Sequence, residues 1–213
     1  MSTVPTNGRL ANTAAILLTL ISSGLAVYAW RVDHSGPVGQ MSPYAVFPLF
    51  GLLAFSLLWC LYTVSAASKY LEVADGTFKR YYQIMGYVIL AAIVAHPTIL
   101  VTQLYRDGFG LPPGSYSAYV AQGMEWVALL GTASLFVFLL YELHRWFEKR
   151  GWWKWIVYLN DLAMLAILYH SLTLGGDLQT TWLRYLWFFY GVMLVIYLVY
   201  LRIYLKLRTS KTA

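Results

Sequence analysis

Two histidines lie deep inside apolar stretches of the chain, where an ionisable side chain is costly to place. His96 is fifteen residues into the stretch that begins near Tyr81, or about 22 Å along a helix. His170 is seventeen residues into the stretch that begins near Trp153, or about 25 Å along. If both helices enter a membrane from the same side, the two imidazoles lie at nearly equal height. Axial ligation of one haem iron by two histidines requires this arrangement.

Two other interpretations of these histidines stay open at the level of sequence. A metal site could combine His96 and His170 with Glu125, although Glu125 is expected near the membrane surface. Alternatively, both histidines are packing residues of an ordinary helical bundle, and Ser171 and Thr98 are available as their hydrogen-bond partners.

The remaining polar residues are expected to do less. His34 and His144 fall in a loop and at the end of an apolar stretch, and both are expected to be solvated. Asp161 lies about 13 Å nearer the start of its helix than His170. It could relay protons or bind a quinol, but the favoured prediction is a hydrogen bond to another helix, for example to Gln83 or Thr132.

The elements that carry these residues are predicted to be membrane-spanning helices. The chain is 60% hydrophobic and 11% charged, whereas soluble domains carry roughly 25% charged residues. A spanning helix needs about 20 mostly apolar residues. Six such stretches are present, near 12–30, 44–67, 81–105, 121–143, 153–174 and 182–205. We therefore predict an all-α bundle of six transmembrane helices forming a single domain over 1–213, with no room for a flavin or nucleotide module of its own.

The positive charges predict the orientation. Twelve of the fifteen Lys and Arg residues fall on one side of the predicted membrane; only Arg31, Arg106 and Arg184 fall on the other. Since positive residues gather on the cytoplasmic side, both termini are expected in the cytoplasm, as in a bacterial-type inner membrane protein. The same asymmetry explains the net charge of +6 without a nucleic-acid partner.

The composition also limits the kind of redox centre. The single cysteine, Cys60, cannot form an internal disulfide, hold an iron–sulfur cluster with partners or attach a c-type haem. It is expected to be a small buried residue. Any haem is therefore held non-covalently, and Arg106 and Arg184 are the candidate partners for its propionates on the outer side.

Two segments resemble a known family. Arg80–Gly86 followed by His96 resembles the third helix of ferric-reductase-like transmembrane domains, which begins with a basic residue and a glycine and reaches a haem-ligating histidine. Arg145–Trp155 resembles the basic, tryptophan-bearing loop before their fifth helix, which ends at a histidine, here His170. The family includes NADPH oxidases, metalloreductases and the haem subunit of bacterial methionine sulfoxide reductase.

The resemblance implies a membrane b-type cytochrome with one haem b. Members with two haems carry a second histidine on each helix nearer the cytoplasm, where this chain has Tyr82, Gln83 and Val157. Only an outer haem is therefore expected, passing electrons to an extracytoplasmic acceptor. Quinol, a flavin or a partner protein on either side of the membrane remain open as electron donors. The resemblance implies that the chain is the haem-binding electron-transfer subunit of a reductase.

Two competing functions are weighed against this prediction. One is a non-catalytic scaffold or accessory subunit of a larger membrane complex, in which the histidines only pack. The other is a small proton or solute transporter that uses Asp161 and the histidines. Transporters often carry inverted repeats, and no internal repeat is evident in the sequence, which disfavours the second alternative.

Overall fold

The structure is a computed structural model that describes residues 6–34, 36–142, 149–180 and 182–204. Within these ranges it is all-α and contains no strand. The long helices are α1 (Thr6–Asp33), α2 (Pro43–Tyr70), α3 (Lys79–Arg106), α4 (Glu125–Tyr141), α6 (Trp153–Leu174) and α8 (Leu183–Val199). The shorter ones are the 3₁₀ helices Val38–Gln40 and Gly114–Ala118, the five-residue α7 (Gly176–Thr180) and a π-helix, Tyr200–Tyr204.

Each of the six apolar stretches contains a helix, as predicted. Among the described residues, five helices are long and apolar enough to cross a membrane: α1, α2, α3, α6 and α8, the last counted through Ile203. The sixth, α4, is apolar but has only 17 residues. The chain is therefore a multi-pass membrane protein by the length and composition of its helices. His144 lies outside the described residues, as do Arg145, Lys206, Arg208 and Lys211 of the charge pattern.

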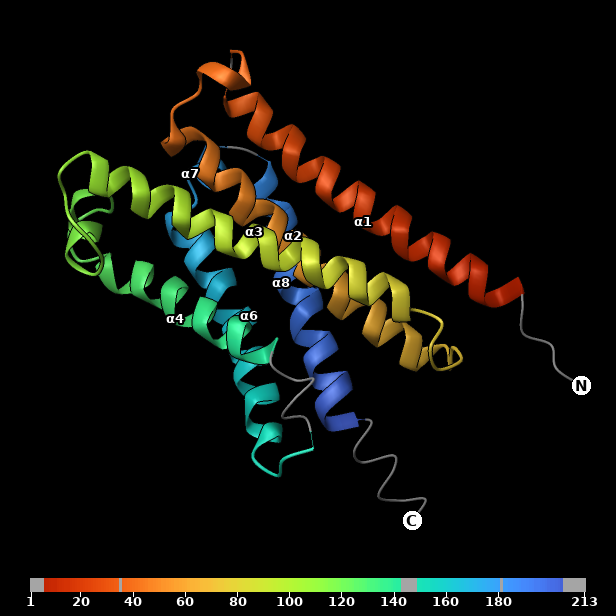
Figure 1. Cartoon of the computed structure of the whole chain (residues 1–213). Helices are drawn as coiled ribbons and strands as arrows, with labels where there is room; N and C mark the ends of the chain where they lie inside the picture. The colour runs from red at the N-terminus through yellow and green to blue at the C-terminus, as the bar shows by residue number, and fades with distance from the viewer. Residues whose placement is uncertain (1–5, 35, 143–148, 181, 205–213) are drawn as a thin grey trace, which may run out of the picture.

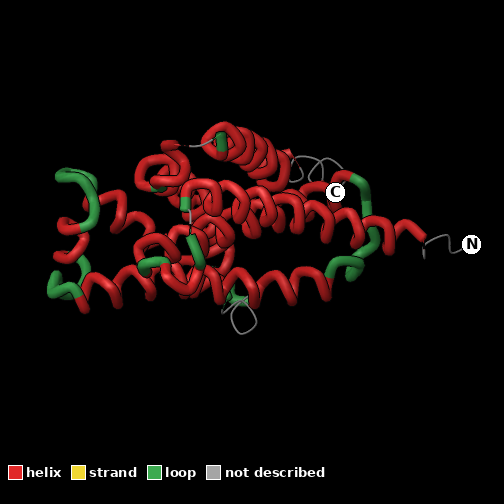
Figure 2. The backbone as a smooth tube through the Cα atoms, turned by 90° about the horizontal axis from the view of Figure 1, so that it is seen from above, coloured by secondary structure: helices red, strands yellow, loops and turns green. Residues whose placement is uncertain are grey.

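The helices run up and down, so that their connections collect at opposite ends (Figure 1). Three connections share one end, which we call the loop end: those between α1 and α2, between α3 and α4, and between α6 and α8. The turn between α2 and α3 lies at the other end. Helices α2 and α3 pack closely as one pair, and α4 and α6 pack as a second pair. Figure 2 shows the same set of helices from above.

Helix α8 holds the two pairs together, since it packs against both α2 and α6. Trp59 of α2 stacks on Tyr190 of α8 with 4.0 Å between ring centroids, and its indole Nε1 donates to the Tyr190 carbonyl at 3.1 Å. Trp187 of α8 is fully buried next to Phe55. Large buried aromatic rings supply much of a core's packing energy, so this cluster fixes the relative position of α2 and α8.

Two prolines show how the spans are shaped. Helix α2 begins at Pro43, directly after Ser42, a position where the missing proline N–H costs nothing. Helix α3 runs unbroken past Pro97, which cannot donate to the Ile93 carbonyl.

Cys60 is fully buried, as predicted.

Candidate functional site

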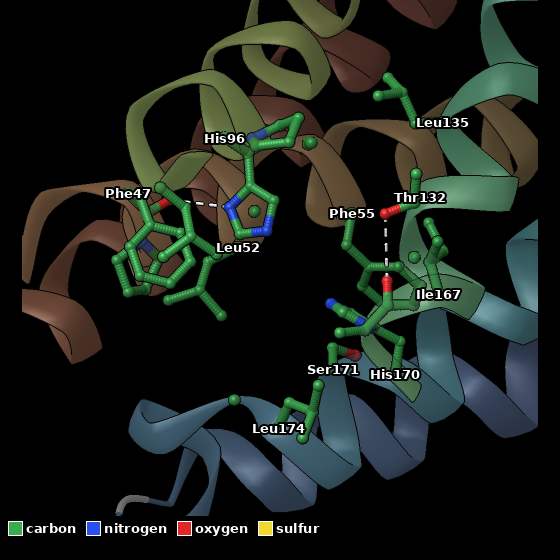
Figure 3. Close-up of a pocket in the computed structure, with 18 of the residues that line it drawn as sticks. Phe47, Leu52, Phe55, His96, Thr132, Leu135, Ile167, His170, Ser171 and Leu174 are labelled. Atoms are coloured by element: carbon green, nitrogen blue, oxygen red, sulfur yellow. Dashed lines mark hydrogen bonds between the residues drawn. The ribbon is translucent and has the colours of Figure 1, made fainter. Parts of the chain in front are cut away.

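His96 and His170 line one cavity at the loop end of the bundle, although they are 74 positions apart in the chain. His96 comes from α3 and His170 from α6, so each helical pair contributes one imidazole. Figure 3 shows the two side chains entering the cavity from different walls. The structure thus brings the two histidines to one cavity.

The imidazole of His96 has a defined tautomer. Its Nδ1 lies 2.8 Å from the backbone carbonyl oxygen of Phe47 on α2. A carbonyl oxygen only accepts hydrogen bonds, so Nδ1 must carry the proton. In the neutral ring the free lone pair then lies on Nε2, which is the nitrogen that can coordinate a metal ion. The Phe47 ring packs beside the imidazole, with 5.1 Å between centroids.

His170 repeats this arrangement on the other pair of helices. Its Nδ1 lies 2.8 Å from the backbone carbonyl oxygen of Val127 on α4, which again places the proton on Nδ1. No hydrogen bond to Nε2 of either His96 or His170 is found among the residues that the structure describes. Two neutral imidazoles, each with an available Nε2, therefore face one cavity.

Two glycines make room for these rings. A Cβ built on Gly51 of α2 would lie 2.8 Å from Cε1 and 2.9 Å from Nδ1 of His96. A Cβ on Gly131 of α4 would lie 2.7 Å from Cε1 and 2.9 Å from Nδ1 of His170. Real Cβ atoms essentially never approach so closely. Any other residue at either position would push the imidazole away from the carbonyl that orients it.

The two halves of the site follow one local pattern. In each, the carbonyl that accepts from the imidazole comes four residues before the glycine beneath the ring: Phe47 and Gly51 on α2, Val127 and Gly131 on α4. The likeness spans only five residues on each helix, so it is local and is not an internal repeat of the chain. In the sequence it appears only as a Gly four residues after an apolar residue.

The rest of the cavity wall is mostly apolar and comes from both pairs of helices. It includes Leu52, Phe55, Leu135 and Ile167, and the cavity has a volume of about 180 Å³. Aliphatic and aromatic walls with few polar groups are typical of binding sites for small molecules and cofactors.

Hydrogen bonds hold two of the wall segments in place. Thr132 of α4 is bonded to the Tyr116 hydroxyl of the α3–α4 connection at 2.7 Å, which draws that connection over the cavity. Ser171, which follows His170, accepts from the Trp187 indole at 3.0 Å. The two hydroxyl groups named above as partners for the histidines do not serve that purpose, since Ser171 donates to Leu168 and Thr98 to Val94.

At the loop end the cavity wall includes a carboxylate that sequence reasoning missed. Asp177 of α7 is only 5% exposed and lines the cavity beside Tyr119. Its Oδ1 lies 3.4 Å from Nδ1 of His34. Burial raises the pKa of Asp177, and His34 partly opposes the rise. His34 was predicted to be solvated; its side chain is instead only 25% exposed, because α7 packs against the end of α1.

The two arginines predicted as propionate partners do not line the cavity. Arg106 is exposed at the end of α3. Arg184 is partly exposed; it donates to Gln179 and lies over the Phe188 ring at 5.7 Å.

The three-ligand metal site is also not formed. Glu125 stands in the first turn of α4, outside the cavity lining. Within the described ranges, no group of three or more His, Cys, Asp or Glu side chains is placed to hold a metal ion.

Asp161 does hydrogen-bond across helices, as favoured, but the partners named for it were wrong. It accepts from Arg202 at 2.6 and 3.1 Å and from the Tyr62 hydroxyl at 2.9 Å; Asn160 donates to that hydroxyl at 2.9 Å. Arg202 lies forty-one residues downstream in the π-helix that follows α8. This cluster ties α6, α2 and the end of α8 together away from the histidine cavity.

The chain was compared with family models, with curated proteins and with solved structures, and none of them matches it. The resemblance to ferric-reductase-like domains therefore rests on the two histidine-bearing segments alone.

Proposed function

We propose that the chain is a six-span membrane cytochrome in which His96 and His170 hold one haem b through their Nε2 atoms. Support comes chiefly from the matched halves of the site: in each, a carbonyl fixes the proton on Nδ1 and a glycine admits the ring. Such a second hydrogen bond is the usual way in which proteins orient a metal-ligating histidine. When bound, the haem supplies reversible one-electron chemistry.

The chain's own residues would orient, enclose and tune such a group. Phe47 and Val127 hold the two imidazoles, and the apolar wall excludes water from the space between them. A porphyrin is larger than the 180 Å³ of this cavity. Its entry therefore requires wall side chains such as Leu135 and Ile167 to change rotamer, a common response of binding sites.

The orientation and the sixth span belong to the same proposal. With α4 as a span, the twelve-to-three charge asymmetry assigns the loop end to the outer side and both termini to the cytoplasm. The 17 residues of α4 measure about 25 Å, slightly less than a typical hydrocarbon core, a mismatch that bilayers accommodate at small cost. The electron would leave at the loop end, to an extracytoplasmic acceptor. Quinol, a flavin or a partner protein would be its source.

The test is an optical spectrum of the purified protein, expressed with ample haem, before and after dithionite. We expect a Soret band and sharp reduced α and β bands at one haem per chain. His96→Ala and His170→Ala should each abolish them, whereas His34→Ala, which changes a histidine outside the cavity lining, should keep them. A featureless spectrum of the unaltered chain would reject the cytochrome and favour the alternative of a non-catalytic scaffold or accessory subunit.

A further inference from the structure

Asp177 is a buried carboxylate that faces the same cavity as the two histidines. It stands on α7, seven residues after His170, where the chain turns from α6 towards α8. A carboxylate in an apolar wall is costly unless it serves as a partner or exchanges protons. None of the roles assigned so far to the cavity uses this group.

His34 connects this carboxylate with the surface. Its side chain is 25% exposed, whereas that of Asp177 is 4% exposed, so the pair reaches from the cavity to the aqueous phase. The Nδ1 atom lies 3.0 Å from the Trp30 carbonyl and 3.4 Å from Asp177 Oδ1. Both neighbours are acceptors, so Nδ1 carries a proton; it is donated to the Trp30 carbonyl, and the carboxylate lies beside it.

Several titratable groups of the described residues face Asp177. The end of α1 contributes His34 and Asp33, and the connection between α3 and α4 contributes Tyr119. Across α7, Arg184 of α8 donates to the exposed Gln179, and α6 contributes His170 in the cavity wall. His34 and, to a smaller extent, the backbone N–H of Asp177 favour its ionised form, while burial and Asp33 favour the protonated form.

We propose that Asp177 and His34 form a proton-exchange site that connects the cavity with the water at the loop end. The inference rests on the proposed function, since the electron is held in the cavity. When a one-electron reductant such as dithionite adds one electron, one proton from water passes by way of His34 to the Asp177 carboxylate, which becomes the carboxylic acid. The net charge of the site then stays constant.

The direction of the coupling follows from electrostatics. An added electron disfavours the carboxylate, so the pKa of Asp177 is higher in the reduced protein than in the oxidised protein. Between these two pKa values the midpoint potential falls as the pH rises. Below both, Asp177 is protonated in either state and its charge has no effect.

Redox potentiometry of the haem-loaded protein over a range of pH tests the proposal. At low pH, Asp177→Asn should have the same midpoint potential as the unaltered protein. At high pH its midpoint potential should be higher, and between the two the potential should depend less steeply on pH. Asp75 is an exposed carboxylate of the α2–α3 turn, and Asp75→Asn is the matched control. It should change neither the midpoint potential nor its dependence on pH. Equal pH dependence in Asp177→Asn and the unaltered protein would overturn the proposal while leaving the cytochrome intact.

Infrared difference spectroscopy gives a readout that does not need haem. A carboxylic acid band that disappears as the pH rises should be missing in Asp177→Asn. In His34→Gln, a partly exposed position that tolerates the change, the band should persist to higher pH, because the positive charge that lowers the pKa of Asp177 is lost. If His34→Gln and the unaltered protein titrate at the same pH, the two residues do not act as a pair.

Discussion

The imidazole of His96 lies directly against the backbone of Gly51, with no space for even one methyl group between them. The ring can take this position only because residue 51 is a glycine and has no Cβ. His170 and Gly131 stand in the same relationship on the other pair of helices. The glycines are therefore as much a part of the candidate site as the histidines.

Gly51→Ala and Gly131→Ala should each weaken haem binding by roughly tenfold or more, which is about 1.4 kcal/mol. The added Cβ would displace the imidazole and break its bond to Phe47 or Val127. Haem titration followed at the Soret band measures the effect. Gly86→Ala in α3 is the control: a Cβ there meets nothing within 4 Å, so binding should not change and the helix should gain slightly. Normal haem content in both cavity variants would contradict the steric argument.

Asp161→Asn should lower the free energy of unfolding by about 1.5–3 kcal/mol, the usual value for a buried hydrogen bond to a charged group. The Asp161 side chain is 11% exposed and accepts from Arg202 and Tyr62, so the substitution leaves the guanidinium without its counter-ion. Thermal unfolding in detergent measures the loss.

The matched control for Asp161→Asn is Asp75→Asn. Asp75 is fully exposed and 4.0 Å from Lys69, so its substitution should leave the free energy of unfolding unchanged. Equal stability of the two variants would mean that the Asp161 cluster is no stronger than a surface ion pair.

Tyr116→Phe should destabilise the loop end by about 1 kcal/mol through loss of its bond to Thr132. The cost should stay small because Thr132 can still donate to the Ala128 carbonyl, 3.3 Å away. Amide hydrogen exchange over residues 107–124 reports the loosening. Tyr105→Phe, an exposed tyrosine at the end of α3, should leave exchange unaltered; faster exchange in both variants would point to a general effect of losing a hydroxyl.

Arg106→Gln and Arg184→Gln should retain a full complement of haem, because neither side chain lines the cavity. Optical spectra of the two purified variants decide this. A loss of haem in either one would mean that the propionates extend beyond the cavity to that arginine, as the sequence had suggested.

The helices and the meeting of His96 and His170 at one cavity were predictable from the sequence because both depend on local patterns. Long apolar stretches mark helices, and similar distances along two helices favour the approach of the residues that they carry. The partners of these residues were not predictable, since they depend on which helix faces which. The oriented carbonyls of Phe47 and Val127 carry no side-chain signal at all. Arg202 lies so far along the chain that its pairing with Asp161 required the packing of α8 to be known.

Asp177 escaped prediction for another reason. In the sequence it is one acidic residue in a short glycine-containing link, indistinguishable from a solvated loop residue. It is buried because α7 packs against the end of α1 and brings His34 to it. The same contact explains why His34, predicted to be solvated, is mostly covered.

The division of the bundle into two helical pairs has a consequence for the life of the protein in the cell. Each pair contributes one half of the cavity, and a group ligated by both histidines would join the pairs as a crosslink between them. Binding to the folded state alone raises its stability by mass action. Chains made without the cofactor would then be the preferred substrates of membrane proteases, and the amount of protein would follow the supply of haem rather than the rate of its own synthesis.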